Sequence, residues 1–372
     1  MYWLSTLYTM GSRKQNILLN YFSDAKAAYM ATEEELRQIP GFTENNIRVV
    51  QKNKDMSVTE RGFEMLELRG ISYIPKYNEK YPFLLKEIDD APIGLFCLGE
   101  FPAQDDFKVA IIGSRKCSEY GLSTARNFGE ALAKNDVVTV SGMARGIDSM
   151  AHRGAVENNG QTIAVLGCGV DICYPPENVE LRDKISQNGC VISEYPLGVP
   201  PHARHFPARN RIISGLSHLL IVVEAGKQSG TLITVDQALE QGRSVMAVPG
   251  NITNQYSYGT NDLIKQGAEP VCSFDDILDV LGLDKLMRVG EITKIIKQKK
   301  KSKITKKNTS NPTDGLAPDE KLVYDVLDFE SLSLEELVVK TNSKINVIQY
   351  LLTMLELKGL IRKLPGARYE KV

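Results

Sequence analysis

Short apolar runs alternate with amphipathic helical stretches through the middle of this chain, and this alternation restricts its fold most. The runs KVAIIG, VVTVSG, TIAVLG, CVISEY, HLLIVVEA and SVMAVPG recur between residues 108 and 250, with helical periodicity between them. Short runs that are apolar at consecutive positions are typical of strands buried on both faces. Strands joined by helices in this way predict an α/β protein with a mostly parallel sheet and helices on both faces. We place this central domain at residues 105–283.

The residues before the central domain predict a small helical domain, residues 1–75, of the helix-hairpin-helix or SAM-like kind. In the segment LRQIPGFTENNIRVV, Pro40-Gly41 separates two short amphipathic stretches. The second helix of such a hairpin can offer backbone N–H groups to a phosphate. The segment is acidic rather than basic, which favours a structural or protein-contact role. Residues 76–104 are expected to form an extended connection packed on the next domain.

The C-terminal part divides into a basic segment and a small folded module. Residues 285–311 hold ten Lys or Arg and one Glu, a net charge of +9, so we expect a polar linker at residues 284–315. A solvated tether is the simpler interpretation, and weak salt-sensitive attraction to nucleic acid is the alternative. Residues 316–372 predict three helices and a hairpin, a pattern similar to a winged helix. Its third helix has few basic side chains, which favours an accessory or protein-contact role over sequence-specific DNA reading.

The overall charge excludes a uniformly basic nucleic-acid binder. The chain of 372 residues carries 45 Lys and Arg against 46 Asp and Glu, so any site for a polyanion must be local. No apolar run approaches the roughly 18–20 residues that span a bilayer, and the first residues lack the basic start of a secretory signal. The six cysteines have no C-x-x-C spacing, which disfavours a zinc site and indicates the reduced thiols of a cytoplasmic protein.

Three strand-to-helix turns have the composition of an anion site. The first strand ends in GSRK (113–116), the second in SGMARGID (141–148), and the fifth leads into EAGKQSGT (224–231). Glycine allows close backbone approach, helix N-termini present free N–H groups, and Arg or Lys completes the site. Because parallel strands end at one edge of a sheet, these turns predict a phosphate-binding rim there. Tight turns with solvated basic side chains are the plainer alternative.

The two common nucleotide-binding fingerprints are missing from this sequence. It has no G-x-x-x-x-G-K-[ST] motif, and no G-x-G-x-x-G motif follows the first strand. These absences disfavour a P-loop NTPase and an NAD-dependent enzyme. We therefore expect no cofactor.

The segment from Tyr195 to Val223 contains no Asp or Glu. It holds three Arg and three His around Phe206, and an aromatic ring in a basic cluster can stack a base beside bound phosphates. Two alternatives stay open. The pair His202 and His205 suggests a metal, but no cysteine or obvious carboxylate partner lies nearby, so no metal site is expected. In the second alternative, the arginines of RNR (209–211) pair with carboxylates across the fold.

These motifs resemble those of the DprA/Smf family of bacterial DNA-processing proteins. The resemblance covers residues 105–283 and is carried by SGMARGIDSMAH, by ISEYP with HFPARNRIISGLS, and by VVEAGKQSGTLITVDQALEQGRSVMAVPG with YGTNDLIKQGA. It implies an extended Rossmann-like domain and a non-enzymatic protein that binds and protects incoming single-stranded DNA. It also implies loading of the RecA recombinase during natural transformation, a homodimer, and single-strand binding protein as a further partner.

Carried onto this sequence, the resemblance implies three groups of site residues. The phosphate pocket takes Gly113, Ser114, Arg115, Ser141, Gly142, Arg145, Gly146, Lys227, Ser229 and Gly230. The DNA track takes His205, Phe206, Arg209, Asn210 and Arg211. The dimer face maps near residues 246–270, with Leu263 and Ile264 as apolar contacts.

The alternative is a nucleotide-binding protein or an enzyme of the same Rossmann-like superfamily. Nucleotide phosphoribohydrolases of the lysine-decarboxylase-like group carry P-G-G-x-G-T-x-x-E, whose Glu acts on the ribosyl bond. Here Gly230-Thr231 matches, the preceding P-G-G is missing and Thr234 stands at the Glu position. We expect Asp148 to orient the second turn and Glu224 to pair with a basic rim residue. A sensor of free nucleotides would use the same rim without the DNA track.

Overall fold

The computed structural model describes residues 1–227 and 229–281 and, near the C-terminus, residues 318–327, 332–341, 345–358, 360–364 and 368–371. The chain divides into two compact units, Met1–Glu291 and Ile292–Val372. Within the larger unit we propose a helical domain at 1–75 and an α/β domain at 105–283. The linker expected at 284–315 lies outside the described residues.

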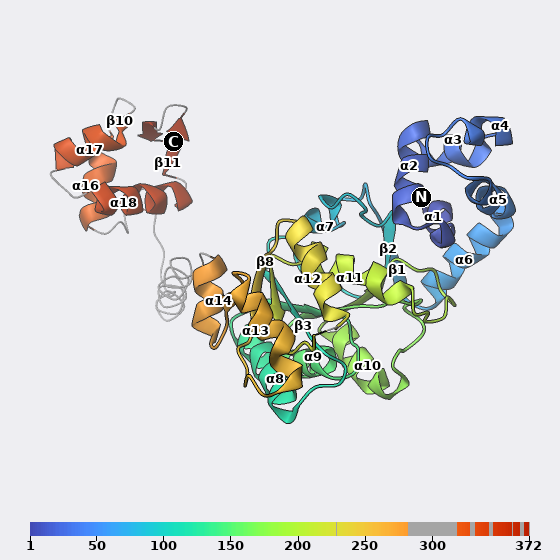
Figure 1. Ribbon diagram of the computed structural model, residues 1–372. Coiled ribbons are helices and arrows are strands. Elements are labelled where there is room, and N and C mark those ends of the chain that lie inside the picture. The colour runs from blue at the N-terminus through green and yellow to red at the C-terminus, as the bar shows by residue number, and fades with distance from the viewer. Residues whose placement is uncertain are drawn as a thin grey trace, which may run out of the picture. The chain divides into compact units, whose positions relative to one another are not determined.

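A nine-stranded sheet forms the centre of the larger unit (Figure 1), with the order β1-β2-β6-β5-β4-β3-β7-β8-β9. Strands β3 to β9 pair in parallel, which confirms the predicted α/β fold. The strands are β1 Ile71–Pro75, β2 Gly94–Gly99, β3 Lys108–Ile112, β4 Val138–Ser141, β5 Thr162–Val165, β6 Gly189–Ser193, β7 Leu219–Val222, β8 Ser244–Ala247 and β9 Glu269–Pro270. Since the chain runs from β3 to β6 on one side and then crosses to β7 on the other, the strand order reverses between β3 and β7.

Helices cover both faces of this sheet (Figure 1), as its consecutive apolar positions require. Helices α7, α11, α12 and α13 pack on one face, and α8, α9 and α14 pack on the other. Helix α10 packs against β5 and β6 in a smaller cluster. The helices are α7 Phe83–Lys86, α8 Glu119–Lys134, α9 Ile147–Glu157, α10 Val179–Gln187, α11 His205–Gly215, α12 Thr231–Glu240, α13 Tyr258–Lys265 and α14 Phe274–Leu281.

Residues 76–104 contribute more than the extended connection expected from their sequence. Strand β2 lies within the sheet, because it pairs antiparallel with both β1 and β6. Its first four residues are fully buried. The run IGLFCLG is therefore a strand of the main sheet, and the helical domain and the α/β domain share one continuous sheet.

The N-terminal helical region contains the predicted hairpin. Its helices are α1 Tyr2–Thr6, α2 Ser12–Phe22, α3 Ala25–Met30, α4 Glu33–Arg37, α5 Glu44–Lys52 and α6 Met56–Leu68, with a 3-10 turn at Tyr8–Met10. Residues 25–37 form two separate helices, α3 and α4, because Thr32 caps the start of α4. The apolar residues Leu36, Ile39, Ile47 and Val50 on both sides of Pro40-Gly41 are buried in one cluster.

In its described residues, the smaller unit has three helices and a hairpin, as its sequence predicts. It contains α16 Pro318–Val326, β10 Leu332–Ser333, α17 Leu334–Thr341, α18 Ile345–Leu357, β11 Ile361–Leu364 and β12 Arg368–Lys371. The strands form a sheet in the order β10-β12-β11. In the described parts of the whole chain, no helix is long and apolar enough to cross a membrane.

Candidate nucleic-acid interface

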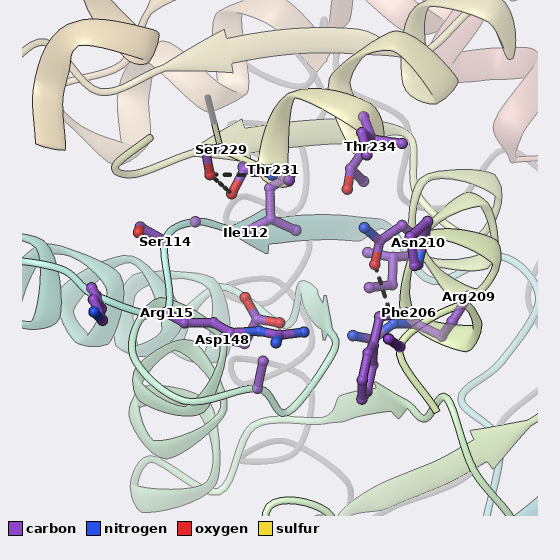
Figure 2. A pocket seen from close by; sticks show the side chains of 18 of the residues that line it. Ile112, Ser114, Arg115, Asp148, Phe206, Arg209, Asn210, Ser229, Thr231 and Thr234 are labelled. Carbon is purple, nitrogen blue, oxygen red and sulfur yellow. Dashed lines mark hydrogen bonds between the residues drawn. The ribbon is translucent and has the colours of Figure 1, made fainter. Parts of the chain in front are cut away.

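A cavity of about 730 Å³ opens beyond the carboxyl ends of the central strands (Figure 2). Its walls come from the end of β3, the turn after β4, the start of α11 and the start of α12. This is where the strand order reverses between β3 and β7, the usual position of a ligand in an open α/β sheet. The predicted residues that line it are Gly113, Ser114, Arg115, Phe206, Arg209, Asn210, Ser229 and Gly230.

Phe206 lies at the centre of an aromatic and cationic cluster in this cavity. The guanidinium carbon of Arg115 lies 4.8 Å from the centre of the Phe206 ring. The ring of Tyr174 stacks against Phe206 with a centroid distance of 5.4 Å and an interplanar angle of 30°. Arg115 is exposed and has no ion pair among the residues that the structure describes. A base and a phosphate can therefore find a ring and a cation side by side.

Tyr174 was not predicted from the sequence. It comes from the loop between β5 and α10, and no local pattern in GCGVDICYPPEN places that loop over α11. An aromatic residue before proline marks a turn and carries no sign of its distant partner. Only the three-dimensional arrangement brings Tyr174 to Phe206.

Arg209 lines the cavity but is 3% exposed, so it is a buried arginine. Its Nη1 donates to the carbonyl of Gly142 at 2.7 Å and to the carbonyl of Val165. Gly142 is the first residue after β4, and Val165 is the last residue of β5. Burial lowers the pKa of Arg209, and the nearby charge of Asp148 opposes this effect. A side chain at Gly142 would collide with the Arg209 guanidinium. Arg209 therefore links the ends of β4 and β5 by hydrogen bonds and also faces the cavity.

Asp148 orients the second turn, as expected. Its Oδ2 accepts a hydrogen bond from the N–H of Gly142 at 3.2 Å. Burial raises the pKa of Asp148, and the charge of Arg209 counteracts that rise. The carboxylate is thus engaged by the backbone turn and by the buried arginine.

Arg211 lies away from the cavity and belongs to a buried ion network. It is 4% exposed, and its guanidinium contacts both carboxylate oxygens of Glu194, at 2.8 and 2.7 Å. It also reaches Asp90 at 3.1 Å and donates to the hydroxyl of Ser12 at 2.8 Å. Burial opposes the charge, but the two carboxylates outweigh it and the pKa of Arg211 is raised. This is the structural alternative for the RNR segment, and we leave Arg211 out of the proposed contact set.

The predicted site residues of the second turn have different surroundings and different roles. Ser141 is fully buried and donates to the carbonyl of Ile111, so its hydroxyl is unavailable to a ligand. Gly146 has φ +79, and a side chain there would meet the backbone of Ser114 and Arg115. This glycine therefore allows the first and second turns to approach each other. Arg145 is exposed and pairs with Glu177.

A second, much smaller cavity of about 20 Å³ adjoins the first. Three arginines line it, namely Arg115, Arg145 and Arg209, together with Tyr174 and Phe206. Such a cluster of cations next to glycine turns suits an anion.

The turn before α12 is only partly what the sequence predicted. Ser229 Oγ accepts from the N–H of Thr231 at 3.2 Å and contacts the Thr231 hydroxyl at 2.9 Å. Lys227 is exposed and does not line the cavity. Glu224 was expected to pair with a basic rim residue, and that expectation is wrong. Its buried carboxylate accepts from the backbone N–H and the hydroxyl of Ser118, because this serine starts α8 and supplies free donors.

His205 sits beside the cavity rather than in it. Its Nδ1 lies 3.1 Å from the carbonyl of Gly167, and its ring stacks on Tyr195 with a centroid distance of 4.2 Å. Burial lowers the pKa of His205, which favours the neutral ring. In the described residues, no group of three His, Cys, Asp or Glu is placed to hold a metal ion.

Leu263 and Ile264, expected at a dimer face, pack inward. Leu263 is 9% exposed and belongs to the main hydrophobic core, and Ile264 packs against that core. Leu263 therefore offers little surface to a second copy, whereas Ile264 stays partly exposed. The dimer face near residues 246–270 stays a prediction.

The fold and the site define an α/β protein with a cation-rich cavity at the strand reversal and a separate winged-helix unit. Residues 72–282 match the family model of DNA recombination-mediator protein A, and residues 307–367 match that of the DprA winged helix domain. The chain belongs to the DprA/Smf family of DNA-processing recombination mediators.

Individual relatives agree with this assignment. Protein Smf of Synechocystis is 32% identical over 390 residues, covering 100% of this chain and 98% of that protein. DprA of Streptococcus pneumoniae is 47% identical over 201 residues, covering 54% of this chain and 71% of that protein.

Solved structures give the same result. The X-ray structure of the pneumococcal DprA has a TM-score of 0.65 at 36% identity and covers 75% of this chain and 95% of its own. A structure of DprA from Helicobacter pylori, described for its single-stranded DNA binding mode, has a TM-score of 0.52 at 31% identity and covers 57% of this chain and 96% of its own.

Proposed function

We propose that this protein binds single-stranded DNA at the cavity beyond β3 and β7 and acts there as a recombination mediator. Phosphates would occupy the cationic turns around Arg115, and a base would stack at Phe206. The finer role that we propose is protection of incoming strands and loading of RecA during natural transformation. Single-strand binding protein and a second copy of the chain are the further proposed partners.

The observation that carries this proposal is the cluster of Arg115, Phe206 and Tyr174 at the cavity. Stacking of bases on aromatic rings combined with backbone phosphate contacts is how proteins hold single strands without strong sequence preference. A duplex keeps its bases stacked inside, so it cannot use such a ring. We therefore expect a preference for single strands and weak discrimination between bases.

The electrostatics of the cavity support a polyanion even though the chain is nearly neutral. Asp148 is the one carboxylate among the described residues that line the larger cavity, and the turn already engages it. Arg115 and Lys116 at the rim are both exposed. Local positive charge of this kind attracts phosphates with a strong dependence on salt.

No observation favours the enzymatic alternative. Thr234 lines the cavity where a phosphoribohydrolase would carry its Glu. Asp148 is buried, hydrogen-bonded and near Arg209, so it is poorly placed to transfer protons.

The test compares Arg115→Ala with the wild-type chain in binding labelled single-stranded and duplex DNA across a salt series. We expect about tenfold weaker single-strand binding, and a salt slope smaller by about 0.7, the value for one phosphate of a single strand. Arg126→Ala is the matched control, because Arg126 is an exposed arginine that pairs with Glu157 and does not line the cavity.

Equal losses in the two variants, or a wild-type preference for duplex, would refute the proposal. Competition by nucleoside monophosphates belongs in the same experiment. Displacement of the strand by micromolar mononucleotide would favour a nucleotide sensor instead.

A further inference from the structure

We propose that Glu177 is an internal competitor for DNA at Arg145, and that its carboxylate holds the place of a phosphate until a strand displaces it. The inference rests on the proposed function and concerns how the same site is regulated. In it, Glu177 is a positioning residue that acts through Arg145 and lowers the affinity for single strands.

The geometry of the pair is the geometry of phosphate recognition. Arg145 Nε lies 2.5 Å from Glu177 Oε1, and Arg145 Nη2 lies 3.0 Å from Glu177 Oε2. The two parallel contacts use the same fork of donors that binds two oxygens of a phosphate. A phosphate cannot adopt this bidentate arrangement while the carboxylate is in place.

The position of the pair places it at the smaller cavity. Arg145 lines that cavity with Arg115 and Arg209, and so do Tyr174 and Pro175. Glu177 follows two residues later, in the 3-10 turn Pro176–Asn178. One loop thus supplies the ring that contacts Phe206 and the carboxylate that covers Arg145.

The exposure of the pair allows it to open without disturbing the fold. The side chains of Arg145 and Glu177 are 55% and 52% exposed, whereas those of Arg211 and Glu194 are 5% and 10% exposed. An exposed ion pair contributes little to stability, while a buried one is costly to break. Glu177 can therefore swing into solvent when a better anion arrives.

The charge balance points to the same role. Asp148 lies near Arg209 and Glu177 pairs with Arg145, and Asp148 is fixed by the N–H of Gly142. Glu177 is the one that can move. Neutralising it adds one uncompensated positive charge at the rim without removing any buried contact.

The test is a gain of affinity. Glu177→Gln should bind single-stranded DNA roughly three- to tenfold more tightly than the wild type at moderate salt, because Arg145 no longer has to exchange partners. Glu157→Gln is the matched control, since Glu157 pairs with the surface arginine Arg126 away from the cavity. Its affinity should stay within about twofold of wild type.

A second pair of variants separates competition at Arg145 from a general charge effect. Arg145→Ala should lower the salt slope by about 0.7. Adding Glu177→Gln to Arg145→Ala should then give no further gain in affinity. A gain that persists without Arg145, an equal gain in Glu157→Gln, or no gain in Glu177→Gln would each overturn the inference.

The result for Arg115→Ala distinguishes failure of the proposed function from failure of the competitor role of Glu177. If Arg115→Ala weakens binding and Glu177→Gln changes nothing, the DNA site stands and the competitor role fails. If Arg115→Ala and Arg145→Ala both bind normally, the proposed function itself fails. Thermal unfolding of each variant should match the wild type, because all three side chains are exposed.

Discussion

The hairpin of the N-terminal region and the cavity of the α/β domain start from the same sequence cue, a glycine turn before a helix. In the hairpin, one N–H of the first turn of α5 is already used, since Asn46 donates to the Thr43 hydroxyl, and the Asn46 side chain accepts from the N–H of Thr43. One of its two arginines, Arg37, pairs with Glu33 and Glu44. In the cavity, Arg115 faces a ring and stays free of ion pairs among the described residues.

The difference shows what a helix N-terminus needs before it can bind an anion. Backbone N–H groups attract a phosphate only if no side chain satisfies them first. Basic side chains help only if no carboxylate already neutralises them. In the hairpin, the N–H of Asn46 and the guanidinium of Arg37 already have such partners, and this favours the structural role expected for it.

The largest expected effect concerns Arg209, which both lines the cavity and holds two strand ends together. Arg209→Ala should lower the free energy of unfolding by about 3–5 kcal/mol, because it leaves Asp148 without its buried cation and two strand-end carbonyls without a donor. Chemical denaturation measures this, with Arg126→Ala as the control that should change little. Wild-type stability combined with lost DNA binding would mean that Arg209 serves the ligand alone.

The next effect uses acid, because all four histidines lie in the α/β domain and none in the hairpin. His152 is fully buried, with Nδ1 2.7 Å from the Thr162 hydroxyl, and burial lowers its pKa to about 3. The unfolded chain takes up a proton near pH 6.5 and the folded chain does not, so stability falls as the pH drops below 6.5. Between pH 6.5 and 5 the loss from this group should be about 2 kcal/mol.

Denaturation curves at several pH values check the prediction. His152→Gln should be less stable at neutral pH but should lose less on acidification than the wild type. If both chains show the same pH dependence, the acid sensitivity belongs to other groups, such as His205 and His218, whose pKa values burial also lowers.

The smallest effect concerns the hairpin itself. Thr43→Ala removes the cap of α5 and should cost about 1 kcal/mol of unfolding free energy. Affinity for single-stranded DNA should stay within about twofold of wild type, since the hairpin takes no part in the proposed site. A tenfold loss of affinity at unchanged stability would contradict this prediction and would mean that the hairpin contacts DNA.

Local pattern was enough to predict the parallel strands of the central domain, their helices and their turns, because each depends on neighbours in the sequence. Consecutive apolar residues marked β3 and β7, and glycines marked the turns that approach the cavity. The partners of each arginine could not be predicted from local pattern. Arg209 and Arg211 lie two residues apart on α11, yet one fastens two strand ends and the other joins Glu194, Asp90 and Ser12. Which partner an arginine meets depends on segments far away in the chain.

The same limit explains the residues that no motif indicated. Tyr174 and Glu177 belong to a loop without regular periodicity, and only the packing of that loop brings them to Phe206 and Arg145. Strand β2 was not predicted as part of the main sheet, for a related reason. It pairs antiparallel with both β1 and β6, whereas the repeating strand–helix pattern predicts parallel strands only.

The network around Arg211 has a consequence for anyone who exchanges parts between relatives. Arg211 on α11, Asp90 before β2 and Ser12 at the start of α2 are joined through one buried guanidinium. A chimaera cut between the helical region and the sheet would take Ser12 away from this guanidinium, which would keep its carboxylate partners but lose a buried hydrogen bond. Grafts of the first hundred residues should therefore carry their own matching α11, and the natural joint for modular swaps lies after α14.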